Sequence, residues 1–187
     1  MAEQSTHRRD SDAELVRRAR RGDDSAFHRL VEAHGGRLYG LAMSLLGRRE
    51  DAEDVVQETF AAAFGGLGGF RGHASVKTWL TRILMKRIAK LRRRQRYRRT
   101  RPIEEADGRN GAAPRPHGDG RADLRMDVAT MLERLSDDHR AVILLREMQG
   151  MSYEEIAKAL AVPRGTVESR LFRARQRLKE LLRDYLP

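Results

Sequence analysis

Apolar residues recur at three- and four-residue steps along the first half of the chain, which predicts a series of amphipathic helices. Ser11 and Glu14 have the spacing of a capping box and predict the start of a short helix. A second apolar stripe begins at Ser25, and a third begins near Glu50 and ends in a glycine-rich break. A fourth helix is predicted from about Ser75 into an arginine-rich stretch.

The second half of the chain has the same helical periodicity in shorter segments. Ser136 predicts the N-cap of a helix that Gly150 ends. Ser152 and Glu155 repeat the capping-box pattern and predict another short helix. A tight turn follows, and Pro163 lies at or near the first turn of a final helix.

The segment 102–123, which reads EEADGRNGAAPRPHGDGRAD from residue 104, has almost no large apolar residue and no period. Its glycine, proline and charge are typical of a flexible linker. The stretches on either side each carry their own helical periodicity. The sequence therefore predicts an all-α fold of two small helical domains, at 11–101 and 124–187, joined by this linker.

Composition narrows the class of protein. A chain of 187 residues suits one ordinary domain or two small ones. The absence of cysteine excludes disulfides, thiolate zinc sites, iron–sulfur clusters and cysteine nucleophiles. No apolar run approaches the roughly 20 residues that cross a bilayer, and the N-terminus lacks the apolar core of a signal peptide. We expect a soluble cytoplasmic protein with no membrane insertion.

The formal net charge of +11 is concentrated in one part of the chain. Residues 59–103 hold 13 basic side chains and no acidic one, and 11 of the 20 residues at 82–101 are lysine or arginine. A solvated basic face is the ordinary interpretation of such a run. Its density nevertheless favours a polyanionic partner, either nucleic acid or an anionic membrane surface.

The stretch SYEEIAKALAVPRGTVESRLFRAR at 152–175 has the dimensions of a helix-turn-helix. An ordinary helical hairpin would have the same helix lengths. The second helix, however, carries Val167 and Leu171 on one side and small or basic residues on the other, which suits a helix that lies in the DNA major groove. Those residues are Arg164, Thr166, Ser169, Arg170 and Arg173.

Carboxylates also recur on the predicted third helix, where Asp51, Asp54 and Glu58 form one stripe opposite an apolar face. The stripe is either a solvated face or, less plausibly, a set of metal ligands, because no histidine lies near it in sequence. Phosphate-loop, metalloprotease and serine-hydrolase motifs are absent from the sequence. We therefore expect no enzyme activity, no metal and no cofactor.

Three segments together resemble one protein family. They are DAEDVVQETF (51–60), FRGHASVKTWLTRI (70–83) and VILLREMQGMSYEEIAKALAVPRGTVESRLFRARQRL (142–178). In this order and spacing they are similar to the extracytoplasmic-function (ECF) group of bacterial sigma-70 factors. The resemblance implies that the 11–101 domain is region 2-like and that the 124–187 domain is region 4-like. Such a protein binds core RNA polymerase, directs it to promoters and assists DNA opening.

The resemblance also implies partners for particular residues. The polymerase largest-subunit clamp helices would bind Asp51, Asp54, Gln57 and Glu58. The −10 promoter element, with its flipped base, would be held by Phe70, Arg71, Gly72, His73, Ala74, Ser75, Lys77, Trp79, Arg82 and Lys86. The −35 element would be read by Arg164, Thr166, Glu168, Ser169, Arg170, Phe172 and Arg173. Trp79 either packs in the core, which is the interpretation we favour, or stacks near the opened strand.

Region 4 would also bind the flap of the second-largest polymerase subunit, and an anti-sigma factor is the expected regulator. Val76, Lys86 and Glu168 depart from the residues frequent in the family, which affects the expected promoter sequence rather than the class. Two alternatives remain. A stand-alone helix-turn-helix regulator would leave the acidic stripe unexplained, and a basic protein that binds RNA or a membrane surface would leave the helix-turn-helix unexplained.

Overall fold

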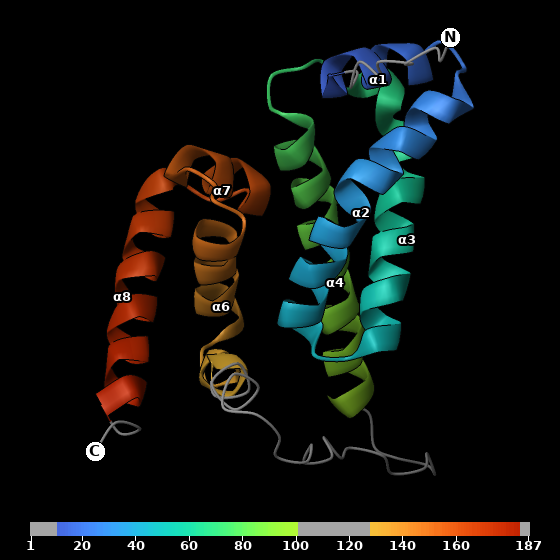
Figure 1. The fold of residues 1–187 in the computed structure, drawn as a ribbon. Coiled ribbons are helices and arrows are strands. Elements are labelled where there is room, and N and C mark those ends of the chain that lie inside the picture. The colour runs from blue at the N-terminus through green and yellow to red at the C-terminus, as the bar shows by residue number, and fades with distance from the viewer. Residues whose placement is uncertain (1–10, 101–127, 184–187) are drawn as a thin grey trace, which may run out of the picture. The chain divides into compact units, whose positions relative to one another are not determined.

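The computed structural model describes residues 11–100 and 128–183 (Figure 1). Within these ranges the chain forms helices and no β-strand, which confirms the all-α prediction. The chain divides into two compact units, Met1–Arg87 and Ile88–Pro187. The predicted linker at 102–123 lies outside the described residues, so the predicted domain boundaries stay a prediction.

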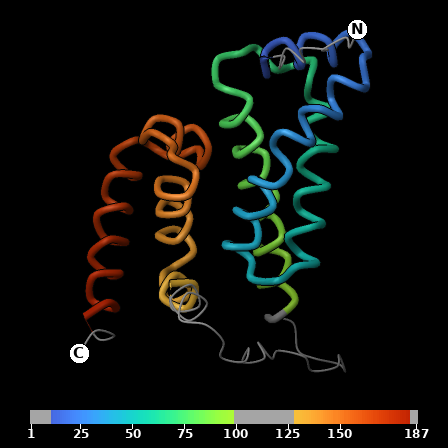
Figure 2. Tube along the Cα trace, viewed as in Figure 1, coloured from blue at the N-terminus to red at the C-terminus, as the bar shows by residue number. Residues whose placement is uncertain are grey.

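The first unit is built from α1 (Asp12–Ala19), α2 (Asp24–Leu46), α3 (Arg49–Gly66) and the 3-10 turn η1 (Leu67–Gly69). The long helix α4 (Val76–Thr100) begins here and continues into the second unit. Helices α2, α3 and α4 run side by side (Figure 2). Side-chain contacts join all three, because Phe27 of α2 packs on α3 and both α2 and α3 contact α4.

Local capping explains where the first two helices begin. Ser11 caps α1 by accepting a hydrogen bond from the backbone N–H of Glu14 at 3.3 Å, as predicted. The Glu14 carboxylate bonds Arg17 instead of returning to the cap, so the second bond of the predicted box is not recorded. Asp23 caps α2 and lies two residues before Ser25, where the predicted apolar stripe begins.

Leucine and alanine fill the core of the first unit. An edge-to-face contact joins Phe27 of α2 to Phe60 of α3, with ring centroids 6.5 Å apart. Arg37 of α2 crosses to α4, where its Nη1 donates to Thr81 Oγ1 at 3.2 Å. Burial lowers the pKa of Arg37. The largest fully buried side chains of the unit are Leu30, Leu38, Leu41, Leu45, Leu80 and Leu84.

The second unit contains a helical stretch at 128–133, then α6 (Asp137–Ile143), η2 (Leu144–Met148), α7 (Tyr153–Leu160) and α8 (Arg164–Arg183). Helices α6, α7 and α8 are compactly packed, with α7 lying across the ends of the other two (Figure 1). Helices α7 and α8 with their short connection form the predicted helix-turn-helix.

Two details of this unit concern its turns. The predicted helix ending at Gly150 is not α-helical throughout, because η2 is a π-helical turn in which the Gln149 N–H donates to the Leu144 carbonyl at 3.1 Å. The α7 capping box is confirmed, with both the Ser152 and Glu155 bonds present. The residue after α7, Ala161, has a φ of 54°, a left-handed conformation that is uncommon for a residue with a Cβ.

Candidate functional site

The predicted acidic stripe lies on the outer face of α3. Ala52, Val55 and Ala63 are buried on the opposite side, which turns the polar residues outward. Asp54, Gln57 and Glu58 are exposed and Asp51 is half-buried. We call these four residues, Asp51, Asp54, Gln57 and Glu58, the acidic face.

Members of the acidic face differ in their contacts. Glu58 forms an ion pair with Arg87 of α4, with the two side-chain atoms 3.5 Å apart. For Asp54 and Gln57 the described part of the chain supplies no side-chain partner, whereas nearby Glu53 is bonded to Arg49 at 2.7 Å. A polar side chain that is exposed and uncommitted can bind a partner protein without first breaking an internal contact.

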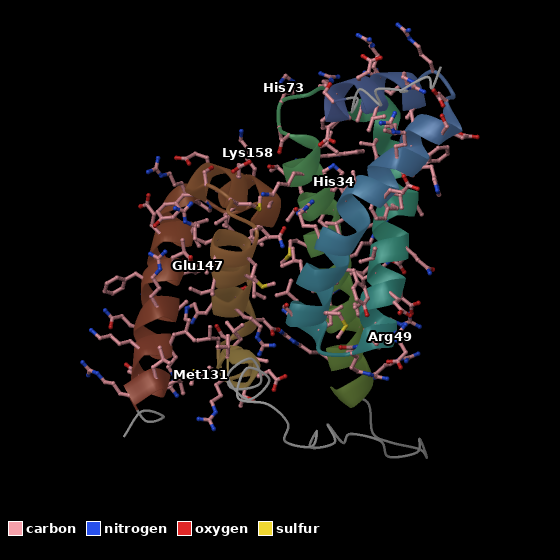
Figure 3. All side chains as sticks on the ribbon, viewed as in Figure 1. His34, Arg49, His73, Met131, Glu147 and Lys158 are labelled. Atoms are coloured by element: carbon pink, nitrogen blue, oxygen red, sulfur yellow. The ribbon has the colours of Figure 1, made fainter. Side chains whose placement is uncertain are left out.

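The loop at 70–75 connects η1 to α4 at the end of the unit where α1 lies (Figure 3, His73). Phe70 anchors this loop, because its ring packs on Trp79 with centroids 4.7 Å apart and a tilt of 43°. Ser75 accepts a hydrogen bond from the Thr78 N–H at 3.1 Å and so caps α4. Gly72 has a φ of 73°, which favours glycine. The side chains of Arg71, His73 and Ser75 are exposed.

Trp79 was expected to pack in the core, and its ring is half-buried against Phe70 and close to Gly66. A Cβ added to Gly66 would lie 3.8 Å from the Trp79 ring, in ordinary van der Waals contact. The indole thus forms the floor of the loop rather than part of the leucine core.

One exposed basic surface follows α4. Its apolar side is buried through Leu80, Leu84 and Ile88, while Arg82 and Lys86 point outward. Lys90 and Arg93 continue the exposed stripe by helical spacing, and α4 contains no acidic residue. We call Arg82, Lys86, Lys90 and Arg93 the basic face of α4. Lys77, in the first turn, is half-buried.

The outer face of α8 carries the residues predicted to read DNA. Val167, Leu171 and Ala174 are buried, and Ser169, Phe172 and Arg173 are exposed, with Phe172 at 64%. Thr166 is half-buried. Phe172 and Glu168 line an open groove of about 350 Å³ together with Tyr153, Leu171, Arg175, Gln176 and Lys179. Exposed aromatic, hydroxyl and guanidinium groups on one helix face match what base edges and phosphates require.

Arg164 and Arg170, also predicted to contact DNA, are engaged within the unit. Arg170 donates from Nη2 to Asp138 Oδ2 of α6 at 2.6 Å. Arg164 lies between two carboxylates, with Nη1 2.5 Å from Glu154 Oε1 and Nε 2.8 Å from Glu168 Oε1. These bonds raise the pKa of Arg164, the bond to Glu168 most strongly. Both arginines therefore contact carboxylates of their own unit before any partner binds.

Family comparison agrees with this geometry in both units. Residues 30–98 match the model of Sigma-70 region 2, and residues 125–178 match that of Sigma-70 region 4. The chain belongs to the sigma-70 family. Sigma factors are non-enzymatic transcription initiation factors that bind core RNA polymerase and promoter DNA.

Named relatives place this sigma factor in the ECF group. It is 37% identical to the RNA polymerase sigma-H factor of Pseudomonas aeruginosa, over 95% of this chain and 96% of that one. It is 36% identical to the ECF sigma factor SigM of Mycobacterium tuberculosis, over 92% of this chain and 85% of that one. The structure is similar to sigma factor RpoE in complex with the anti-sigma factor NepR from Bartonella quintana, with a TM-score of 0.65, 31% identity and coverage of 84% and 96%.

Sequence reasoning missed several acidic residues that hold the sigma factor's recognition helix. Glu154, Asp138 and Glu147 each bond an arginine of α8. Glu147, labelled in Figure 3, pairs with Arg175 at 3.0 Å. Their partners lie 10 to 32 residues away in sequence, so no local pattern signals these pairs.

The described residues contain neither a metal-binding cluster nor a membrane-spanning helix. Within 11–100 and 128–183 there is no group of acidic and histidine side chains that could hold a metal ion. None of the helices described there is both long enough and apolar enough to cross a membrane.

Proposed function

We propose that this sigma factor binds the clamp helices of the polymerase largest subunit through the acidic face of α3. The observation that carries the proposal is the state of Asp54 and Gln57, which are exposed on a rigid helix and have no recorded partner among the described residues. Because α3 is held by the bundle core on its other side, this face needs no rearrangement to dock.

Promoter opening is the second part of the proposal. The loop at 70–75 leads directly into α4, which carries the basic face, and the rings of Phe70 and Trp79 pack on each other at this junction. A flipped base loses a few kcal/mol of stacking, which aromatic contacts and phosphate contacts together offset. Arg82 and Lys86 supply the phosphate contacts, so region 2 holds the opened −10 strand.

Recognition of the −35 element belongs to α8. Ser169, Phe172 and Arg173 are presented together on its exposed face, where a major groove admits a helix. The region 4-like unit also binds the flap of the second-largest subunit. As the homologues act on RNA polymerase, the site of action is the bacterial cytoplasm.

An anti-sigma factor completes the proposal. The similar RpoE structure is a complex with the anti-sigma factor NepR. Covering the acidic face of α3 would prevent polymerase binding without any need to unfold either unit. We therefore assign regulation of this sigma factor to a protein that competes with the clamp.

Run-off transcription tests the promoter-directing role. Fragmented genomic DNA of the source organism is transcribed by bacterial core polymerase with and without the protein, and the transcript starts are sequenced. Discrete starts that require the protein and share two upstream elements are expected. If the protein neither binds core polymerase nor produces new starts, a regulator that acts without polymerase becomes the better account.

The acidic face is tested by Asp54→Ala combined with Gln57→Ala. We expect polymerase binding, measured by co-elution with core enzyme, to be abolished while the helical circular dichroism signal is unchanged, because both side chains are exposed. Glu32→Gln, an exposed carboxylate of α2 that pairs with His28, is the control and should bind normally. Unchanged affinity of the double variant would contradict this assignment of α3.

A further inference from the structure

An acidic cluster surrounds Arg164, the first residue of α8, at the point expected to face DNA. Glu154 of α7 and Glu168 of α8 both bond Arg164, so two negative charges surround one positive charge. The three side chains are 54%, 47% and 61% exposed in that order. A helix that enters the major groove thus begins with a net charge of −1 in this cluster.

A negative cluster is poorly suited to phosphate. The DNA backbone is polyanionic, and its affinity for a protein comes from lysine and arginine that replace counterions. The charge of Arg164 is already neutralised by two carboxylates. The pKa of Glu154 is lowered by a hydrogen bond from the backbone N–H of Glu154 itself, and the charge of Arg164 adds to this effect. The cluster therefore contributes little to affinity for the DNA backbone, and the carboxylates are better suited to contacts with base edges.

Cytosine is the base whose edge suits a carboxylate. In the major groove cytosine presents the N4 amine, a donor with no adjacent acceptor, whereas guanine presents two acceptors and thymine presents one. Adenine offers a donor beside the N7 acceptor, which suits an amide better than a carboxylate. A desolvated carboxylate that faces acceptors is repelled, so it discriminates by rejection as well as by attraction.

The bonding pattern leaves the required atoms available. Arg164 occupies one oxygen of Glu168, Oε1, and no partner is recorded for Oε2 among the described residues. Within that same part of the chain Arg164 uses Nε and Nη1, and no partner is recorded for Nη2. A donor that suits guanine and an acceptor that suits cytosine therefore lie side by side.

We propose that Glu168 is a specificity-determining residue that selects one C·G base pair in the −35 element, with Arg164 beside it and Glu154 as the positioning residue for Arg164. This inference rests on the proposed function of α8. It differs from general DNA binding, because it assigns base identity to an acidic residue that weakens attraction to phosphate.

A purely structural role predicts something else. An exposed i,i+4 ion pair stabilises a helix by only about 0.3–0.5 kcal/mol, so its loss would change stability slightly and would affect all promoters alike. Later in α8, Arg177 and Glu180 form an ion pair of the same chemistry at 2.9 Å. Glu180→Gln therefore removes an equivalent charge and bond from the same helix and is the matched control.

The test uses the full-length protein in holoenzyme with core polymerase. The −35 element of a promoter found by run-off transcription is randomised, and the transcribed sequences are counted against the input for the wild type, Glu168→Gln, Glu154→Gln and Glu180→Gln. Glutamine keeps the size of glutamate but can bond adenine N6 and N7 together. It therefore reports the base at the position that Glu168 contacts.

The wild type is expected to prefer cytosine at one position by about tenfold or more, and Glu168→Gln to shift that position towards adenine by a similar factor. Glu154→Gln should weaken the cytosine preference there without a shift to adenine, and Glu180→Gln should match the wild type. The proposal is overturned if the wild type has no such position, if Glu168→Gln matches the wild type or weakens all positions equally, or if Glu180→Gln gives the same shift. A wild-type protein that starts no transcripts would instead contradict the proposed function.

Discussion

The two basic helices of this sigma factor hold their charge in different ways. In α4 the basic face has no recorded carboxylate partner within the described residues, and the helix itself contains no acidic residue. The carboxylate pairs of α4 involve other arginines, namely Arg87 with Glu58, and Arg92 and Arg96 with Asp137. In α8 four arginines are bonded to carboxylates of the same unit. Those arginines are Arg164, Arg170, Arg175 and Arg177.

This difference separates two tasks that net charge alone does not distinguish. The cations of the basic face of α4, which pair with no carboxylate among the described residues, attract any polyanion. This attraction weakens as the salt concentration rises. Arginines bonded to carboxylates attract phosphate more weakly, and the ion pairs favour the orientations that these side chains have in the free protein, which suits base reading. We propose from this contrast that α4 supplies affinity for opened DNA and that α8 supplies sequence preference.

Removing charge from α4 should give the largest effect. On a single strand each phosphate contact contributes about 0.7 to the slope of log affinity against log salt, so Arg82→Gln with Lys86→Gln should flatten that slope by about 1.4. At 0.1 M salt this corresponds to a loss of roughly 25-fold in holoenzyme affinity for promoters of any sequence. Filter binding over a salt series measures both quantities.

The control for this experiment removes two charges, one from α1 and one from the turn after it, through Arg17→Gln and Arg21→Gln. Both arginines are exposed and lie outside the basic face, so the salt slope should remain that of the wild type. A loss confined to particular promoter sequences in the α4 variant would remove the contrast between the helices.

A smaller effect is expected from Arg173, the arginine of the exposed α8 face without a recorded partner in the described residues. Arg173→Ala should reduce transcription from the native promoter about tenfold, since a good base contact is worth about 1–3 kcal/mol, while core polymerase binding is retained. Arg177→Ala, which removes only the pair with Glu180, should reduce transcription less than threefold. Equal loss of polymerase binding and transcription in Arg173→Ala would argue against groove reading.

The smallest effect concerns a carboxylate that is internally committed in the first unit. Hydrogen bonds from Ser25, Arg18 and the Ala26 N–H lower the pKa of Asp23 from 3.8 to about 2. A depressed folded pKa gives stability that is present above about pH 4 and is lost as pH falls towards 2. Asp23→Asn keeps an N-cap acceptor but lacks the charge, so it should be less stable than the wild type near pH 7 and lose less stability on acidification, the two proteins converging towards pH 2.

Urea unfolding at pH 5 and pH 3 measures this difference. Trp79 is the single tryptophan of the chain and lies in the same unit as Asp23, so its fluorescence reports that unit. An identical loss of stability in both proteins would show that Asp23 is not a source of the acid sensitivity.

Much of the fold follows from local sequence signals. Ser152 and Glu155 specify a capping box three residues apart, and both of its bonds form. Ser11 and Glu14 have the same spacing, but Arg17 lies one turn after Glu14 and takes its carboxylate. Spacing therefore predicts where a helix begins more reliably than it predicts the partners of its cap.

The candidate site follows from sequence only in part. Helical periodicity places Asp54 and Gln57 outward, and Ser169, Phe172 and Arg173 on one face, as predicted. The packing of residues distant in the chain determines which arginines bond to carboxylates. Arg170, for example, bonds to Asp138, which lies 32 residues earlier in the sequence. The roles of these residues in polymerase and promoter binding stay predictions.

The π turn at Leu144–Met148 has a consequence for how this gene product tolerates insertions and deletions. A π turn contains one residue more per hydrogen-bonded ring than an α turn. Because the π turn takes up one extra residue within about one turn, deleting that residue would restore α-helical bonding and leave the later side chains close to their present directions. Glu147, which pairs with Arg175, and Arg146, which bonds the Met151 carbonyl, belong to this turn and would have to be kept. The chain should therefore tolerate loss of one residue here better than in the regular turns of α8.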